Sequence, residues 1–92
     1  MISSNRSRSR TEIVSQILDT AANGGSGGVT KAKIMYKAFL NHDQLKAYLS
    51  LLTENQLLHY DKAMNTFKTT KKGLLLLQAY NQIDQILKEQ HC

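Results

Sequence analysis

The first regular pattern of hydrophobic positions falls within residues 9–23 and predicts a helix. Apolar residues recur there three and four positions apart, so they share one face: Ile13, Val14, Ile17, Leu18 and Ala21. Ser9 and Glu12 have the spacing of a capping box, in which each side chain satisfies a backbone N–H of the other residue. Asn23 and Gly24 tolerate left-handed backbone and are expected to end this helix. The glycine-rich residues 24–28 are then expected to form a flexible connector.

Two further helices are predicted on either side of a short break at residues 40–41. Thr30 is the expected N-cap of a helix over residues 31–39, whose apolar side contains Ile34, Met35 and Ala38, with Phe39 at its end. Asn41 is the expected N-cap of the next helix, and Gln44 can return the bond to the cap backbone. The buried row of that helix has the spacing i, i+3, i+4, i+7: Leu45, Tyr48, Leu49 and Leu52. Asn55 is expected to end it in left-handed backbone.

After Asn55 the pattern changes from helical to extended. Residues 57–60 and 65–69 are short runs rich in aromatic and β-branched residues, and the polar residues 61–64 join them. Such a pair of runs predicts a β-hairpin. Thr70 can cap a final helix that continues to about Glu89, a length of roughly 30 Å.

This order of elements predicts a mainly α fold with one small β-hairpin (α+β), a winged helix-turn-helix with a long C-terminal dimerisation helix. The corresponding division of the chain is a flexible basic arm (residues 1–8), a winged helix-turn-helix DNA-binding domain (9–72) and a dimerisation helix (73–92).

The last helix carries the spacing of a coiled-coil seam. Positions 76, 80, 83 and 87 are separated by 4, 3 and 4 residues, and position 86 widens the stripe. A domain of this size can cover Leu74 and Leu77, but it does not easily reach residues 80–87. The expected dimerisation residues are Leu76, Tyr80, Ile83, Ile86 and Leu87, and the expected state is a homodimer.

Charge points to a polyanionic partner for the first part of the chain. The 92 residues contain 12 Lys and Arg against 7 Asp and Glu, a net charge of +5. Residues 1–72 carry eleven basic and five acidic groups (+6), whereas residues 73–92 carry one and two (−1). A basic body of this kind is the usual footprint of a nucleic-acid binder.

In a winged helix-turn-helix, the second helix of the pair fits the DNA major groove and its outward side chains reach bases and phosphates. The outward residues here are Gln44, Lys46, Ala47 and Ser50, which would supply any sequence preference. The hairpin tip would lie along the DNA backbone or minor groove. Phosphate contacts are expected from the cations of the arm, the helices and the hairpin: Arg8, Arg10, Lys31, Lys33, Lys46, Lys62, Lys68 and Lys71. The expected partners are therefore double-stranded DNA and a second copy of the chain.

Residues 10–92 resemble a known family, the small archaeal winged-helix DNA-binding proteins. Members of this family dimerise through an antiparallel coiled coil of the C-terminal helix. The resemblance rests on the run KAKIMYKAFLNHDQLKAYLSLLTENQLL and on TTKKG at the start of the last helix. It implies that residues 43–55 form the recognition helix and that the protein is a transcriptional regulator or a chromatin-associated protein. The sequence departs from the family at GGSGG, at Gln56 where a glycine often stands, and in its short hairpin connector.

Other classes of function find little support in the sequence. No nucleophile–base pair, paired carboxylates or phosphate loop has a catalytic spacing, so an enzyme, a cofactor and an obligatory small molecule are not expected. The histidines and Cys92 do not have metal-ligand spacing. No segment has the length or hydropathy of a membrane span or signal peptide. Together with the expected DNA binding, this predicts a cytoplasmic, nucleoid-associated protein. Tyr36, Tyr48 and Tyr60 are expected to be buried rings with a solvated hydroxyl. A protein-interaction module and RNA binding through the arm remain the alternatives.

Overall fold

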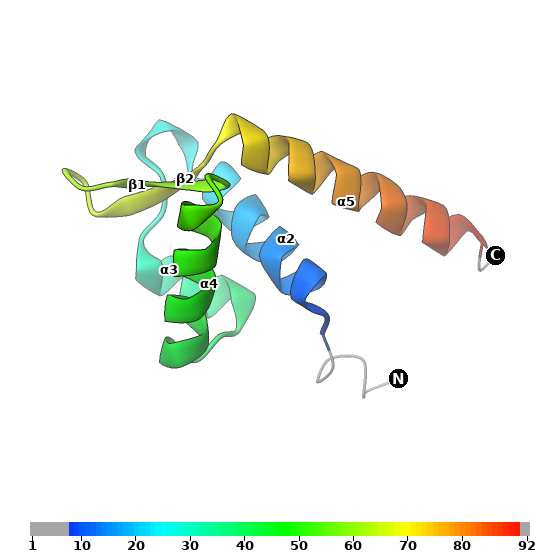
Figure 1. The fold of residues 1–92 in the computed structure, drawn as a ribbon, viewed down its shortest axis with the longest axis horizontal. Helices are drawn as coiled ribbons and strands as arrows, with labels where there is room; N and C mark the ends of the chain where they lie inside the picture. Colours follow the sequence, from blue (N-terminus) through cyan, green and yellow to red (C-terminus); the bar gives the residue numbers. More distant parts are fainter. Residues whose placement is uncertain (1–7, 91–92) are drawn as a thin grey trace.

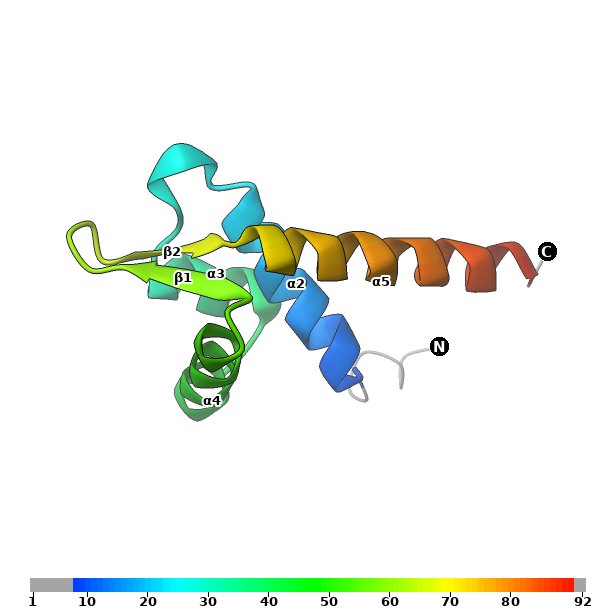
Figure 2. The ribbon, with the colours of Figure 1, turned by 45° about the horizontal axis from the view of Figure 1, so that its top comes forward.

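The computed structural model describes residues 8–90, in which a group of helices packs beside one small sheet. The elements in chain order are α2 (Arg10–Ala22), the 3₁₀ turn η1 (Gly25–Gly27), α3 (Lys31–Ala38), α4 (His42–Glu54), β1 (Leu58–Asp61), β2 (Thr66–Thr69) and α5 (Lys71–Gln90). Helices α2, α3 and α4 gather beside the hairpin, and α5 extends away from them (Figure 1). The hairpin tip and the end of α5 point in opposite directions (Figure 2). The predicted mainly α fold with one antiparallel hairpin is confirmed.

The helix starts follow from local side-chain chemistry. In α2, the Glu12 N–H donates to Ser9 Oγ at 3.1 Å and the Ser9 N–H donates to Glu12 Oε1 at 2.8 Å. In α4, the Gln44 N–H donates to Asn41 Oδ1 at 2.8 Å, and the Asn41 N–H donates to Gln44 Oε1 at 3.0 Å. Both predicted capping boxes are therefore present. Each one satisfies N–H groups that the first turn of a helix cannot pair internally.

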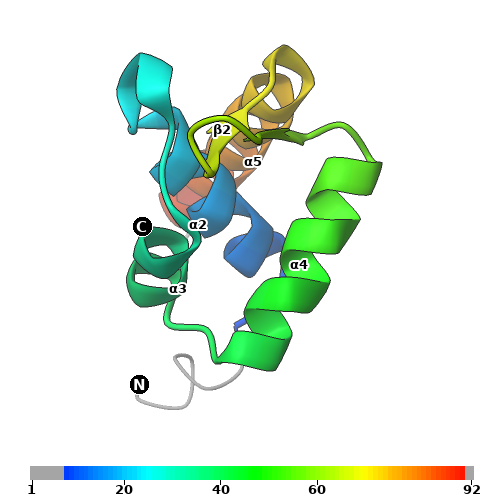
Figure 3. The ribbon, with the colours of Figure 1, turned by 90° about the vertical axis from the view of Figure 1, so that its left-hand side faces the viewer.

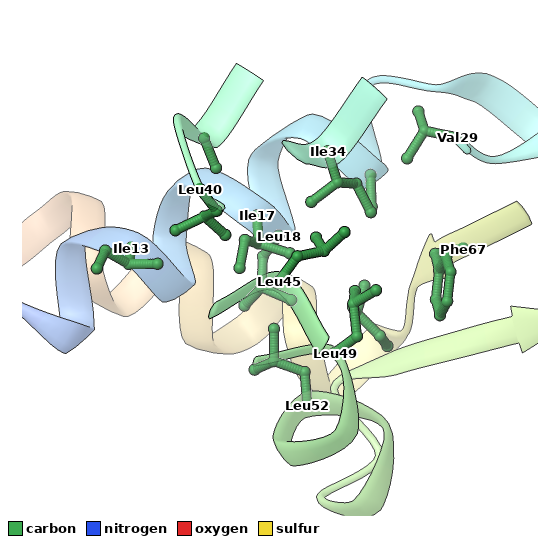
Figure 4. Close-up of a cluster of buried hydrophobic side chains, with 13 residues drawn as sticks. Ile13, Ile17, Leu18, Val29, Ile34, Leu40, Leu45, Leu49, Leu52 and Phe67 are labelled. Carbon is green, nitrogen blue, oxygen red and sulfur yellow. The ribbon is translucent and has the colours of Figure 1, made fainter. Parts of the chain in front are cut away.

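The core lies where the three N-terminal helices meet the hairpin, and their apolar side chains converge there (Figure 4). Ile17, Leu18, Ile34 and Leu52 are the largest fully buried side chains. Burial of each contributes about 1.5–3 kcal/mol of hydrophobic free energy. The predicted apolar rows of the first three helices are therefore core, with Tyr48 partly buried against it.

The hairpin pairs Leu58 with Thr69 and Asp61 with Thr66, within a residue of the predicted strands. Its second strand has a further partner, because Val29 and Phe67 exchange backbone hydrogen bonds of 2.9 and 2.7 Å. The glycine-rich segment before Val29 is not a free connector, since it forms η1 and the Thr66 hydroxyl donates to the Gly27 carbonyl at 2.6 Å.

Left-handed backbone occurs one residue later than predicted at two helix ends. Gly25 (φ 72°) adopts it after α2, rather than Asn23 or Gly24, and Gln56 (φ 63°) adopts it after α4, rather than Asn55. At the end of α4 the Leu57 N–H donates to the Leu52 carbonyl, which is the bond pattern of a Schellman motif. The chain reversal needs its left-handed residue one position beyond the cap, so Gln56 occupies the place that favours glycine.

Helix α5 begins with the predicted cap and is joined closely to the end of α4. The Gly73 N–H donates to Thr70 Oγ1 at 3.0 Å, and Lys72 Nζ donates to the Asn55 carbonyl at 3.1 Å. Gly73 is buried, and its backbone lies so close to Leu57 that an added Cβ would be only 2.3 Å from the Leu57 carbonyl oxygen. Leu77 is buried as predicted, but Leu74 is 41% exposed. At this turn the backbone of Gly73, and not the side chain of Leu74, therefore packs against the rest of the domain.

Replacement of Gly73 by alanine should destabilise the fold by about 1–3 kcal/mol, because the added Cβ overlaps the backbone of residue 57. Helix propensity alone predicts the opposite, an increase of about 1 kcal/mol in the free energy of unfolding. Urea denaturation of Gly73→Ala measures the difference, and Gln78→Ala, exposed on the same helix, is the control. A Gly73→Ala protein as stable as the wild type would contradict the observed contact.

Candidate nucleic-acid interface

The outer face of α4 is uncovered. Leu45, Leu49 and Leu52 turn inward, whereas the four residues predicted to face DNA are all exposed: Gln44, Lys46, Ala47 and Ser50. Figure 3 shows α3 and α4 joined by the short turn of the helix-turn-helix. This outer face is therefore accessible to a ligand.

One flank of α4 faces the hairpin. Ser50 and Thr53 line a groove of about 310 Å³ with Tyr60 of β1 and Lys31 at the start of α3. Lys46 is four residues before Ser50 and therefore stands on the same side of the helix. The structure thus brings together cations and hydroxyl groups from α3, α4 and the hairpin. Thr53 and Tyr60 were not predicted for this surface, because only the packing of the hairpin against α4 places them there.

The other flank of α4 faces the start of α2. Gln44, Ala47 and Leu51 line a second groove, of about 420 Å³, together with Arg10. Arg10 is the first residue of α2, and the groove places it beside α4. The Gln44 side-chain oxygen accepts the capping bond from Asn41, so a bidentate contact with adenine would have to replace that bond.

The ridge between these flanks is not basic. Asp43, Ala47, Ser50 and Glu54 follow one another at helical spacing, and all four are exposed. The two carboxylates stand near opposite ends of α4. Phosphate contacts are therefore favoured on the flank that carries Lys46.

The hairpin tip is held by its own side chains. Asp61 Oδ1 accepts hydrogen bonds from the N–H groups of Ala63 (3.0 Å) and Met64 (3.3 Å), and the Tyr60 hydroxyl donates to Asn65 Oδ1 at 2.6 Å. Lys62 is exposed in this turn. Lys68 instead forms an ion pair with Asp61, with 3.7 Å between Nζ and Oδ2. Of the two predicted wing cations, Lys62 is therefore the one without an acidic partner among the described residues.

The remaining predicted cations occupy three places. Lys31 and Lys33 are exposed in the first turn of α3, and Lys71 is exposed in the first turn of α5. Arg8 donates hydrogen bonds to the Gln16 side chain and to the Phe39 carbonyl, the latter at 3.4 Å. The rest of the predicted arm, residues 1–7, lies outside the described residues.

The predicted dimerisation residues divide into two groups along α5. Leu76 and Tyr80 line an apolar groove of about 260 Å³ formed with α2 and the end of α4. Ile83, Ile86 and Leu87 are exposed on the part of α5 that projects beyond the other elements (Figure 2).

Residues 8–90 contain neither a candidate metal site nor a candidate membrane span. No group of three or more His, Cys, Asp or Glu side chains in this part of the chain could hold a metal ion. None of its helices combines the length and hydropathy of a membrane span.

The winged helix-turn-helix class is defined by three helices and a β-hairpin. Here α3 and α4 form the helix-turn-helix, and the hairpin that follows packs on α4. Residues 7–88 match the model of the winged helix-turn-helix family, and the chain belongs to that family. Such domains are typically non-enzymatic and bind DNA, and the exposed α4 fits double-stranded DNA. The search of curated proteins found no match.

Proposed function

We propose that this protein binds double-stranded DNA as a homodimer and acts as a transcriptional regulator or a nucleoid-associated architectural protein. In this proposal residues 9–72 bind DNA, residues 1–8 form a basic arm, and residues 73–92 form the dimerisation helix. The wing-facing flank of α4 carries the proposal. There Lys46 and Ser50 are exposed beside Lys31 and the hairpin, and the described chain leaves this flank open.

The charge distribution supports phosphate contacts on this side of the molecule. Lys31, Lys33 and Lys46 come from the two helices of the helix-turn-helix, and Lys62 lies in the hairpin turn. In proteins of this class the recognition helix reads base edges in the major groove, while neighbouring elements contact phosphates. Ser50 and the free amide group of Gln44 are the polar groups available for base contacts.

The exposed apolar side of α5 supports the homodimer. An apolar patch of this kind on a helix that leaves its own domain is typical of an association surface. The similarity of residues 10–92 to small archaeal winged-helix proteins supports an antiparallel pairing of the two helices. The two DNA-binding domains would then lie at opposite ends of the pair.

Replacement of Lys46 by alanine should weaken duplex binding about fivefold to tenfold and reduce the slope of log affinity against log salt by about 1 per lost phosphate contact. Fluorescence anisotropy with a labelled random-sequence duplex measures both quantities. Lys37→Ala is the matched control, because it removes the same charge from α3 outside the groove that Lys31, Ser50 and Tyr60 line. Equal affinity of Lys46→Ala and wild type would exclude this flank as the interface.

The oligomeric state and the type of binding are tested together. Size-exclusion chromatography should show a dimer, and a gel shift with random duplex at low salt should show binding. A monomer that does not bind duplex would contradict the proposal and favour a protein-interaction module. Selection of bound sequences from a random pool then separates the two roles, since an enriched inverted repeat indicates a regulator and no enrichment indicates an architectural protein.

A further inference from the structure

Two aromatic side chains on α3 are the most exposed large hydrophobic residues in the described chain. Tyr36 is 77% exposed and Phe39 is 78% exposed. The sequence pattern predicted the opposite for both, with Tyr36 as a buried ring and Phe39 on the apolar side of the helix. A helix turns about 100° per residue, so Tyr36 points about 200° away from Ile34 and Ala38, which are buried.

Phe39 also stands in a backbone conformation that a bulky residue rarely adopts. Its φ is 55° and its ψ is 50°, which is left-handed helical. The turn needs this conformation, because the Leu40 N–H then donates to the Met35 carbonyl and Leu40 enters the core. Glycine would serve the turn with less strain. The phenyl ring therefore adds nothing to the turn, and little of it is buried in the fold.

The charges around these two rings are basic. Residues 31–42 contain Lys31, Lys33 and Lys37 and no acidic residue. Lys33 and Lys37 line a shallow groove with one carboxylate, Asp19 of α2, so this side keeps a net positive charge. Arg8 reaches the end of α3 as well, through its hydrogen bond to the Phe39 carbonyl.

We propose that the outer face of α3, formed by Lys33, Tyr36, Lys37 and Phe39, binds single-stranded nucleic acid. Exposed aromatic rings stack on unpaired bases, and flanking cations hold the phosphates. Bases within a duplex are already stacked on each other, so a duplex offers these rings no unpaired base to stack on. A second copy of the chain is disfavoured as the occupant, because the same basic face would meet itself. This face shares Lys33 with the proposed duplex contacts, but its two rings lie outside the groove that Lys31, Ser50 and Tyr60 line, so the inference does not depend on duplex binding.

The test uses the full-length protein and a fluorescein-labelled oligothymidylate of about 16 nucleotides, followed by anisotropy at low salt. Wild type should bind it. Tyr36→Ala and Phe39→Gly should each weaken binding about fivefold or more, the effect expected from the loss of one stacked base. Neither substitution should change duplex affinity by more than about twofold, because neither ring carries charge or lines the groove beside Ser50. Phe39→Gly should also leave the melting temperature unchanged or raise it, since glycine relieves the left-handed strain.

Two controls separate this face from the duplex interface. Lys46→Ala should lose duplex affinity but keep its affinity for oligothymidylate, and Met64→Ala removes an exposed apolar side chain from the hairpin without touching α3. Wild-type protein that ignores oligothymidylate would overturn the proposal and leave an acidic protein as the occupant that fits the patch. Unchanged binding by both α3 variants would overturn it too. If oligothymidylate binds and duplex does not, this inference stands and the proposed duplex function fails.

Discussion

Duplex affinity is expected to fall about 10³- to 10⁵-fold when the salt concentration rises from about 50 to 200 mM, if a dimer contacts six to ten phosphates. Each phosphate neutralised by a lysine or arginine releases condensed counterions, and added salt opposes that release. In the proposed dimer, two copies of the chain would bring Lys31, Lys33, Lys46 and Lys62 to the DNA twice, which is enough for this number of contacts. The measurement is an anisotropy titration with one random duplex at several salt concentrations.

The slope of log affinity against log salt also shows whether phosphate contacts supply the affinity. A salt-independent affinity would contradict a phosphate-based mechanism, because the ridge of α4 offers few other polar contacts. A steep wild-type slope that Lys46→Ala and Lys31→Ala leave unchanged would place the phosphate contacts elsewhere, with residues 1–7 as the next cationic segment to remove.

The parts of the fold that depend on neighbouring residues could be predicted from the sequence. The capping boxes at Ser9 and Asn41 join residues three apart, and their hydrogen bonds are the predicted ones. The apolar rows of α2 and α4 also follow from helical spacing alone. The strands of the hairpin lie within one residue of the predicted runs, because short β-rich runs with a polar turn between them mark a hairpin locally.

The parts that depend on distant residues could not be predicted. The bridge between Val29 and Phe67 joins residues 38 positions apart, and no local pattern marks it. The need for glycine at position 73 appears only when the carbonyl of Leu57 is placed above it. The exposure of Phe39 follows from the left-handed turn that brings Leu40 into the core, which helical periodicity does not describe.

The same division applies to the candidate site. The outward residues of α4 followed from its buried row, because exposure on a helix is the complement of burial. The residues that share grooves with them could not be predicted in this way, since Tyr60 reaches this surface from the hairpin and Arg10 lies on the opposite flank. Sequence spacing could therefore identify the residues of one helix but not the grooves that they share with other elements.

Replacement of Ile83 by lysine is expected to convert the dimer to a monomer and to weaken duplex binding with it. Ile83 is 58% exposed on the projecting half of α5, so the change costs the isolated domain little. In a dimer the side chain is lost twice, and each buried isoleucine contributes about 1.5–3 kcal/mol. The dimer dissociation constant should then rise about 10²- to 10⁴-fold, and DNA should be held by one half of the phosphate contacts. Sedimentation equilibrium measures the first effect and anisotropy the second.

Gln85→Lys is the matched control, because it adds the same charge to the same helix outside the apolar stripe. Gln85 lies on α5 two residues from Ile83, hence about 200° around the helix, and is exposed. This variant should remain a dimer with duplex affinity equal to or slightly above that of the wild type. If Ile83→Lys stays dimeric, the apolar stripe of α5 is not the interface. Ready oxidation of Cys92 to a disulfide within the dimer would instead keep the interface and contradict the proposed antiparallel arrangement, in which the two α5 helices would run in opposite directions along a pair roughly 30 Å long.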